Sequence, residues 1–378
     1  MTASYSFRFE KQYRYLTDCY IMRWENQTLW ADLILTIPIG FCLFAGIFLG
    51  HPAAGMIAAG GAMNTGFGKK QVIYQSNLFP MILVTLGMAL AGFLGVLVGH
   101  NGLWIVPLVA LSAFGYGMLT TRTDGYAWVA QQSIITLLVA SAFPAPLKQA
   151  ALRGTLLLLG GLLQLLFSAL LSPLLGQMNL RVKELKKNLF EEELALRTTV
   201  VAMANSVWQR KALNSALPYA IRVTFALTLA TEIARHLHYS SGYWIPMTAL
   251  VVMKPTVVDT VNRVAARTLG TLAGAACISF LLAHLNPGVI PLAMLTLLFA
   301  WLGYGFVNVN YALFTFTVTG YIVFLLSIIK TPELEVAVHR TVCTLIGVSI
   351  AASVRLLVIT HYRSLWKHAL HKLTARSK

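Results

Sequence analysis

Two arginines and a lysine in the second half of the chain could bind an anion inside a membrane. Arg263 and Arg267 are four residues apart, so both would lie on one face of a helix, and Lys254 precedes them. A guanidinium group grips a carboxylate through two parallel hydrogen bonds. A buried arginine at the centre of a membrane helix costs about 2.5 to 3.5 kcal/mol on insertion scales. Arg267 begins an apolar run, so it should face protein, water or an anion.

Other basic and aromatic side chains could extend this path. Arg222 is expected toward the same side of the membrane as Lys254, whereas Arg153 and Arg340 are expected toward the other side. Aromatic rings could stack on an aromatic substrate. The candidate rings are those of Trp244, Tyr304, Tyr116, Trp128 and Tyr311. An alternative stays open for each Arg or Tyr near a helix end, because such residues also serve as anchors in the headgroup layer.

An acidic residue in a membrane segment could couple transport to the proton gradient. Glu232, near the outer end of an apolar segment, is the best candidate, and Asp124 and Asp259 are weaker ones. Glu232 also precedes Arg235 by three residues, so the two side chains could instead pair with each other on a helix.

The chain lacks the short motifs of familiar catalytic and nucleotide sites. It contains no HExxH, GxSxG or P-loop sequence, so neither a membrane enzyme nor ATP hydrolysis by this chain is indicated. The four cysteines are widely spaced and form no CxxC pair, which argues against a zinc site and a disulfide framework. We therefore expect no enzyme activity, no cofactor and no metal.

Composition indicates that these residues lie in a membrane protein. Of 378 residues, 57% are hydrophobic and 11% are charged, whereas about a quarter of a typical soluble domain is charged. The net charge of +16 could indicate a nucleic-acid partner, but such proteins gather Lys and Arg on an exposed face. Here 23 of 29 Lys and Arg residues fall on the side expected to be cytoplasmic. That asymmetry is the positive-inside pattern of membrane proteins, so no nucleic-acid partner is expected.

The apolar segments predict an all-α integral membrane protein with about twelve spans of about 20 residues each. Residues 1–30 should form an interfacial segment, 31–176 a first six-helix repeat, 177–215 a cytoplasmic linker helix, 216–360 a second six-helix repeat and 361–378 a basic tail. Both termini would then be cytoplasmic. The predicted spans are 31–50, 52–68, 78–99, 102–120, 125–143, 150–175, 216–235, 243–258, 264–285, 288–306, 309–329 and 338–360.

The two halves share sequence features at matching places, which predicts an internal repeat. The third span of each half has Thr-Leu-Gly, the fourth ends in Gly-Tyr-Gly, and the sixth has Arg followed seven residues later by Gly. Matched residues stand 183 to 188 positions apart. Because each half has an even number of spans, the halves should share one orientation. The matched pairs include Thr85 and Thr268, Gly115 and Gly303, Tyr126 and Tyr311, Arg153 and Arg340, and Gly160 and Gly347.

Two spans at corresponding places are short or interrupted. Residues 243–255 contain Pro246 and end in a Lys-Pro pair, and their counterpart, 52–68, is rich in glycine. Such spans leave backbone groups unpaired, which is tolerated where they line a cavity or a site. Alternatively, neighbouring helices absorb the kinks. Asn308 and Asn310 could line a polar cavity or form a turn.

One stretch of the second half carries a distinctive set of residues. They are Tyr243-Trp244, Thr248, Pro255 and the run Arg263-x3-Arg267-x2-Gly270-Thr271-x2-Gly274. This set resembles the signature of the fusaric acid resistance proteins, in the aromatic acid exporter superfamily. The resemblance implies export of aromatic or other organic carboxylates across a bacterial inner membrane, often alongside a periplasmic adaptor protein. The chain departs from many relatives in lacking large cytoplasmic domains, and its first half lacks the paired arginines.

The favoured function is an inner-membrane exporter of organic anions, above all aromatic carboxylates, driven by the proton gradient through Glu232. The proposed substrate-binding residues are Arg267, Arg263, Lys254, Tyr243, Trp244, Thr248, Arg222, Tyr304, Arg153 and Arg340. A passive anion channel, which needs no coupling acid, is the alternative, and a membrane scaffold without transport is another. Expected partners are membrane lipid and the anion, while a homo-oligomer and an adaptor stay open.

Overall fold

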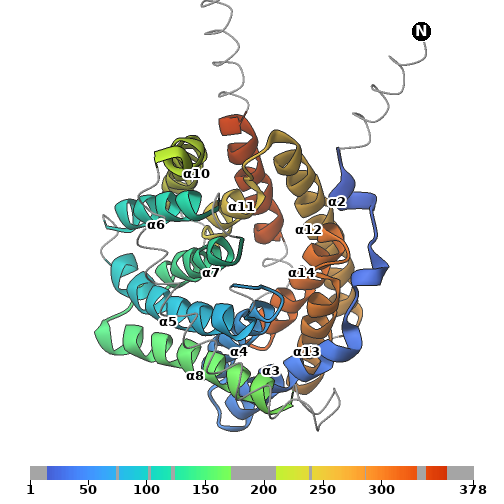
Figure 1. Ribbon diagram of the computed structural model, residues 1–378. Coiled ribbons are helices and arrows are strands. Elements are labelled where there is room, and N and C mark those ends of the chain that lie inside the picture. The colour runs from blue at the N-terminus through green and yellow to red at the C-terminus, as the bar shows by residue number, and fades with distance from the viewer. Residues whose placement is uncertain are drawn as a thin grey trace, which may run out of the picture.

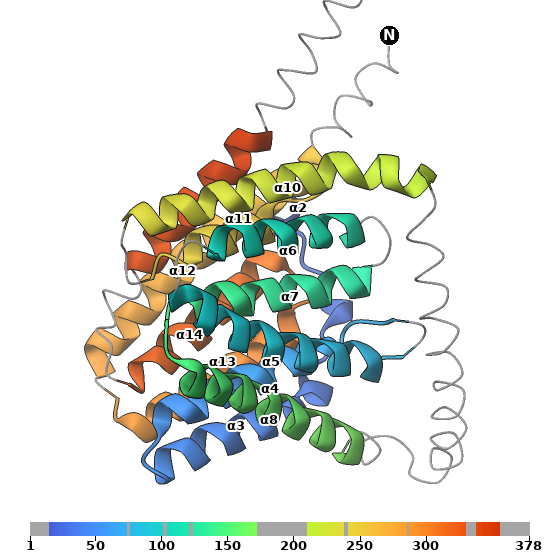
Figure 2. The same ribbon diagram turned by 90° about the vertical axis from the view of Figure 1, so that its left-hand side faces the viewer.

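The protein is helical wherever its structure is described. The computed structural model describes residues 15–73, 76–100, 104–120, 124–171, 210–237, 241–285, 287–329 and 338–355. Each of the twelve predicted spans contains a helix (Figures 1 and 2). The first half has α3 (Leu29–Phe48), α4 (Pro52–Gly68), α5 (Leu78–His100), α6 (Ile105–Thr120), α7 (Asp124–Ser141) and α8 (Leu147–Leu171). The second has α10 (Arg210–Leu237), α11 (Trp244–Val252), α12 (Val257–Leu285), α13 (Val289–Phe306), α14 (Tyr311–Ser327) and an unlabelled helix over 338–355.

Six of the described helices are long and apolar enough to cross a membrane. They are Leu29–Phe48, Leu78–Gly99, Leu147–Leu170, Ala216–Leu237, Val257–Leu285 and Val289–Phe306. The helices α6 and α14 are apolar but shorter, with 16 and 17 residues. A helix satisfies all its backbone hydrogen bonds internally, which is why apolar runs in lipid become helices. Most of the predicted linker helix and the whole basic tail lie outside the described residues.

The interruption predicted in the second half is present, although Pro246 does not cause it. The helix α11 has only 9 residues, which span about 14 Å, or about half of the hydrocarbon core. Pro246 lies in its first turn, where no backbone N–H is needed for helical hydrogen bonding. The helix ends at Val252, and Met253 is extended just before the Lys-Pro pair. Lys254 therefore lies in a link between α11 and α12.

The helices form two large buried cores, and each of these two draws on both halves of the chain. One core joins α5, α6 and α7 to α10, α11 and the 338–355 helix. The other joins α12, α13 and α14 to α3 and α4. Several glycines make close contacts between the halves. For example, Gly117 of α6 packs on Ala220 of α10, and Gly305 of α13 packs on Leu29 of α3. In Figure 1, α6 accordingly lies beside α10 and α13 beside α3.

Contacts within the halves also correspond. Gly160 of α8 lies against the carbonyl oxygen of Ala58 in α4, and Gly347 lies against the carbonyl oxygen of Ile245 in α11. The two glycines stand 187 positions apart, and so do their two partners. A side chain at either glycine would collide with backbone, so both helix pairs depend on glycine for their close approach.

The described part of the N-terminal segment forms two short turns rather than one interfacial helix. These are α2 (Thr17–Tyr20) and η1 (Trp24–Asn26). Leu16, just before α2, has a left-handed backbone with φ of 65°. The segment is fixed to the bundle because α2 contacts both α12 and α14 where these helices begin. We call this side of the bundle the α2 end.

Candidate functional site

Two arginines from different helices are buried in the membrane domain. Arg340 is 1% exposed and Arg267 is 5% exposed, and among the described residues they are the buried cations. Arg267 lies on α12, and Arg340 lies near the start of the 338–355 helix. Arg340 is within electrostatic range of Arg267 and Tyr243. Tertiary packing thus brings together two positively charged groups that are far apart in the sequence.

Several buried nitrogens of these arginines have no hydrogen-bond partner within the part of the chain that the structure describes. All three guanidinium nitrogens of Arg340 are buried without one, and so is Nε of Arg267. The buried hydroxyl groups of Thr248, Thr271 and Thr344 are unpartnered as well. A buried polar atom without a partner costs about 1 to 3 kcal/mol, and a charged one costs more. Such a concentration of unsatisfied donors marks a place where a ligand or water completes the hydrogen bonding.

The helices place these side chains on facing surfaces. Arg340, Thr344 and Gly347 follow one another along one face of the 338–355 helix, and Gly347 packs against Thr248 of α11. One turn before Thr248 on α11, the ring of Trp244 lies 4.1 Å from Cζ of Arg340. We call Arg267, Arg340, Trp244, Thr248 and Thr344 the buried arginine site.

Aromatic rings connect this site to a third arginine. From Trp244, the ring of Tyr243 is 5.2 Å away between centroids, and the ring of Phe143 is 6.2 Å from that of Tyr243. Cζ of Arg153 lies 4.8 Å from the Phe143 ring. Arg153 and Arg340 are the matched arginines of the two halves, so the stack joins residues in corresponding positions. Rings next to guanidinium groups provide flat surfaces on which an aromatic anion can stack.

No buried carboxylate offsets the charge of the site. Among the described acidic residues, only Asp32 of α3 is buried, at 3% exposure, and its carboxylate lies 2.6 Å from Nζ of Lys70. A buried charge that lacks a partner is unfavourable by several kcal/mol. An anion bound at the buried arginine site would supply the missing negative charge and accept the free hydrogen bonds.

Arg263 and Lys254 lie apart from the buried site, toward the α2 end. Arg263 is one turn from Arg267 on α12 and faces a cavity of about 640 Å³ at that end. Lys254 lies in the link before α12, where burial and then neighbouring Arg263 lower its pKa to about 8, opposed by Asp18, Asp259 and Asp124. The structure thus places these basic residues in two separate groups, and a path between them stays a prediction.

Three other predicted residues lie elsewhere. Tyr304 is buried in the other core, where its hydroxyl donates a hydrogen bond to the Met63 carbonyl oxygen at 2.8 Å. Arg222 on α10 lies within electrostatic range of Arg355. Glu232 is 38% exposed and accepts a hydrogen bond from Arg235 at 3.0 Å. The pairing alternative for Glu232 is thus present, and its coupling role stays a prediction.

Sequence reasoning missed several residues around these sites. Thr344 could have been found, because Arg267 and Thr271 have the same spacing as Arg340 and Thr344. The role of Phe143 could not be predicted in this way, because Phe143 lies outside α8 and α11, the two helices between which its ring lies. Asn308 and Asn310, in the link between α13 and α14, both line the cavity at the α2 end. Asn310 also caps α14, because its side chain accepts a hydrogen bond from the backbone N–H of Leu313. Both alternatives considered for these residues are therefore present.

Comparison with known proteins agrees with the resemblance read from the sequence. Residues 229–354 match the family described as fusaric acid resistance protein-like, a stretch that contains all five residues of the buried arginine site. The chain is 32% identical over 110 residues to the uncharacterized transporter YdhK of Salmonella typhimurium, covering 29% of this chain and 16% of that protein. It is 31% identical over 133 residues to the inner membrane protein YccS of Escherichia coli, covering 35% and 18%. No solved structure matches the chain.

The aligned regions are short relative to those proteins, since they cover less than a fifth of each relative. The family resemblance nonetheless holds for the segment that carries α11, α12 and the 338–355 helix. Together with the long apolar helices, these matches identify a multi-pass membrane protein related to transporters.

Proposed function

We propose that the protein transports organic anions across the bacterial inner membrane, with the buried arginine site as the substrate site. The observation that carries this proposal is the Arg340 guanidinium, which is buried beside Arg267 with no hydrogen-bond partner among the described residues. An anion bound there would neutralise like charges and accept their hydrogen bonds. Trp244 next to Arg340 favours a substrate with an aromatic ring, so aromatic carboxylates are the substrate class.

The corresponding contacts of the two halves support an arrangement of two six-helix repeats in one orientation, with about twelve crossings and both termini in the cytoplasm. The shared cores and the paired glycine contacts are the relevant observations. In such an arrangement the short α11 opens a path on one side of the buried arginine site. The cavity in front of Arg263 lies on the other side.

Flux of labelled benzoate in proteoliposomes tests the proposal, with and without an imposed pH gradient. The variant Arg340→Gln keeps the side chain polar but removes the charge, and it should reduce flux at least about tenfold, because charge-assisted hydrogen bonds are lost. The matched control is Arg235→Gln, at an exposed arginine that pairs with Glu232. Unchanged flux in Arg340→Gln would exclude the buried arginine site as the substrate site.

A passive anion channel is the second candidate, and one observation favours it. Glu232, the residue predicted to couple transport to protons, is already paired with Arg235, and the buried Asp32 is paired with Lys70. A proton-driven carrier should lose uphill transport in Glu232→Gln. A channel should instead show downhill flux only, with the same rate in wild type and in Glu232→Gln.

A further inference from the structure

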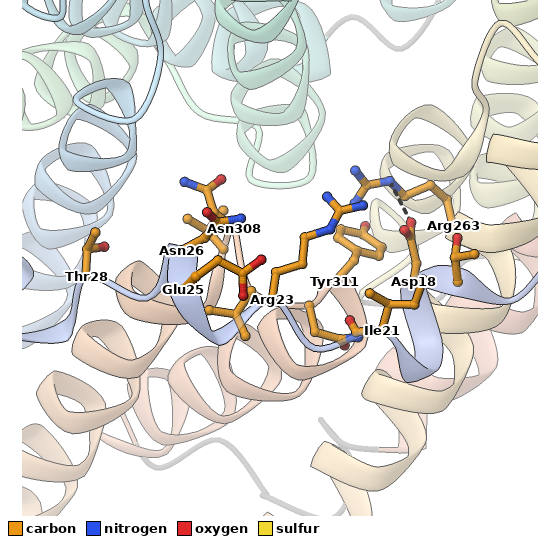
Figure 3. Close-up of a pocket in the computed structure, with 13 residues that line it drawn as sticks. Asp18, Ile21, Arg23, Glu25, Asn26, Thr28, Arg263, Asn308 and Tyr311 are labelled. Atoms are coloured by element: carbon orange, nitrogen blue, oxygen red, sulfur yellow. Dashed lines mark hydrogen bonds and ion pairs between the residues drawn. The ribbon is translucent and has the colours of Figure 1, made fainter.

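The cavity at the α2 end is enclosed in part by the N-terminal segment. It has a volume of about 640 Å³ and is lined by residues of α2 and η1, by Arg263 of α12 and by the link between α13 and α14 (Figure 3). Both charged and amide side chains face it, including Asp18, Arg23, Glu25, Asn26, Asn308 and Asn310. This cavity is separate from the buried arginine site, one helical turn away along α12.

The N-terminal wall of the cavity is held in place by specific hydrogen bonds. Asn262 accepts from the backbone N–H of Leu16 at 2.6 Å and donates to the hydroxyl of Thr17 at 2.8 Å. The backbone N–H of Arg23 donates to the Val309 carbonyl oxygen at 3.1 Å. Asn310 donates to the carbonyl oxygen of Ile21 at 2.9 Å. These bonds fix the backbone that presents Asp18 and Arg23 to the cavity.

Two arginines from distant parts of the chain meet in this cavity. Cζ of Arg263 lies 3.9 Å from the centroid of the Tyr311 ring, and its Nε lies 3.3 Å from a carboxylate oxygen of Asp18. The Arg23 side chain makes no hydrogen bond or ion pair with the other described residues. In Figure 3 the side chains of Arg23 and Arg263 point toward one another above Tyr311.

We propose that Arg23 and Arg263 together bind an oxyanion, a carboxylate or a phosphate group, in the α2-end cavity. Two guanidinium groups that converge provide several N–H donors in fork geometry, which suits such an anion. The Asp18 carboxylate contacts only the Nε edge of Arg263. It therefore competes with the bound oxyanion for the Arg263 guanidinium group. Amide groups of Asn26 and Asn308 lie in the same cavity and provide further donors.

The oxyanion could come from a soluble molecule or from a lipid headgroup. The cavity lies where membrane helices begin, and lipid phosphates are concentrated at such boundaries. Binding at this site is an equilibrium property that does not require transport through the buried arginine site. The two proposals can therefore fail independently.

Calorimetric titration of the purified full-length protein with benzoate and with inorganic phosphate tests for a soluble ligand. The titration uses the Arg340→Gln background, so that binding at the buried site does not contribute. In that background, Arg23→Gln should weaken binding about tenfold, as expected for loss of a charge-assisted hydrogen bond. Asp18→Asn should strengthen it about twofold to fivefold, because a half-exposed competing charge is removed. The control is Arg235→Gln, at an exposed residue with a local partner.

Native mass spectrometry of protein from nanodiscs containing phosphatidylglycerol tests for the lipid source. Retained anionic lipid should decrease in Arg23→Gln and increase in Asp18→Asn. Opposite effects of these two variants on any of the three ligands support the proposal and identify the source. The proposal is overturned if none of the three binds saturably, or if both variants keep wild-type affinity for each ligand that binds.

Discussion

Two buried charged regions of this protein differ in one respect, which is whether the charge has a partner. In the first half, Lys70 donates to both carboxylate oxygens of Asp32, at 2.7 and 2.6 Å, and thereby joins the start of α3 to the end of α4. In the second half, Arg340 and Arg267 are buried near each other, and their buried nitrogens Nε of Arg267 and Nε, Nη1 and Nη2 of Arg340 have no carboxylate or hydrogen-bond partner among the described residues. The charges of the first arrangement are paired, and those of the second are not.

The comparison separates a structural role of buried charge from a binding role. A satisfied ion pair holds two helices in register, and it has no remaining capacity for a substrate. Unsatisfied buried arginines lower the stability of the protein and keep their hydrogen-bonding capacity for an anion. The two regions should therefore respond in opposite ways to loss of charge.

The largest expected effect on stability follows removal of one partner of the complete pair. Asp32→Asn should lower the free energy of unfolding by about 3 to 5 kcal/mol, because Lys70 would remain buried and charged. Thermal unfolding of the purified protein in detergent measures the change. The double variant Asp32→Leu with Lys70→Met should recover most of the loss. A single variant as stable as wild type would show that the ion pair does not hold α3 and α4 together.

Removal of a charge from the incomplete site should have the opposite effect on stability. Arg340→Met should abolish benzoate flux and leave unfolding unchanged, or stabilise the protein by about 1 to 4 kcal/mol, as when buried charges are replaced by apolar side chains. Flux and thermal unfolding are measured on the same preparation. A less stable protein that still transports would mean that Arg340 has a structural role like that of Lys70.

The aromatic part of the buried arginine site should contribute less than its charge. Trp244→Leu keeps an apolar side chain but removes the ring that lies against Arg340. Benzoate affinity should fall about tenfold or less, since an aromatic stacking contact contributes about 0.5 to 1.5 kcal/mol. The ratio of benzoate to acetate affinity is the decisive measurement. An unchanged ratio would show that the ring does not contact the substrate.

The smallest expected effect concerns Lys254 and pH. Burial and Arg263 lower its pKa to about 8, so the side chain is positive below that pH and becomes neutral as the pH rises above it. Anion binding at the α2 end should therefore weaken by about twofold to fivefold between pH 7 and pH 9, because one nearby positive charge is lost. Lys254→Arg should remove this pH dependence, because arginine stays charged. Equal pH profiles in the two proteins would exclude Lys254 as the titrating group.

Helix positions were predictable from the sequence because lipid imposes a simple rule. Every backbone hydrogen bond must be made within the segment, so a long apolar run has to be a helix. The twelve predicted spans each contain one. The short α11 was also predictable, since the Lys-Pro pair ends it, although Pro246 was assigned a break that it does not cause. The first turn of a helix tolerates proline, which explains the difference.

The membership of the sites was only partly predictable. Arg267, Arg340, Trp244 and Thr248 were named from their residue types and from the family resemblance, whereas nothing in the sequence shows that Arg340 lies near Arg267. Tyr304 was predicted as a substrate-binding residue because its aromatic ring could stack on an aromatic substrate. It instead packs in the core formed by α12, α13 and α14 with α3 and α4. The ion pair of Asp32 was missed because its partner belongs to another helix end.

The sequence by itself determined that this is a helical membrane protein, where its described helices lie, and that its second half resembles fusaric acid resistance proteins. Only the tertiary structure decided which charges meet, because contacts between helices depend on how glycines allow two backbones to approach. The close packing of Gly347 against Ile245 brings the helix that carries Arg340 next to Trp244. The close packing of Gly117 and Gly305 brings helices of the two halves together. Those contacts decide which buried charges pair with each other and which have no partner among the described residues.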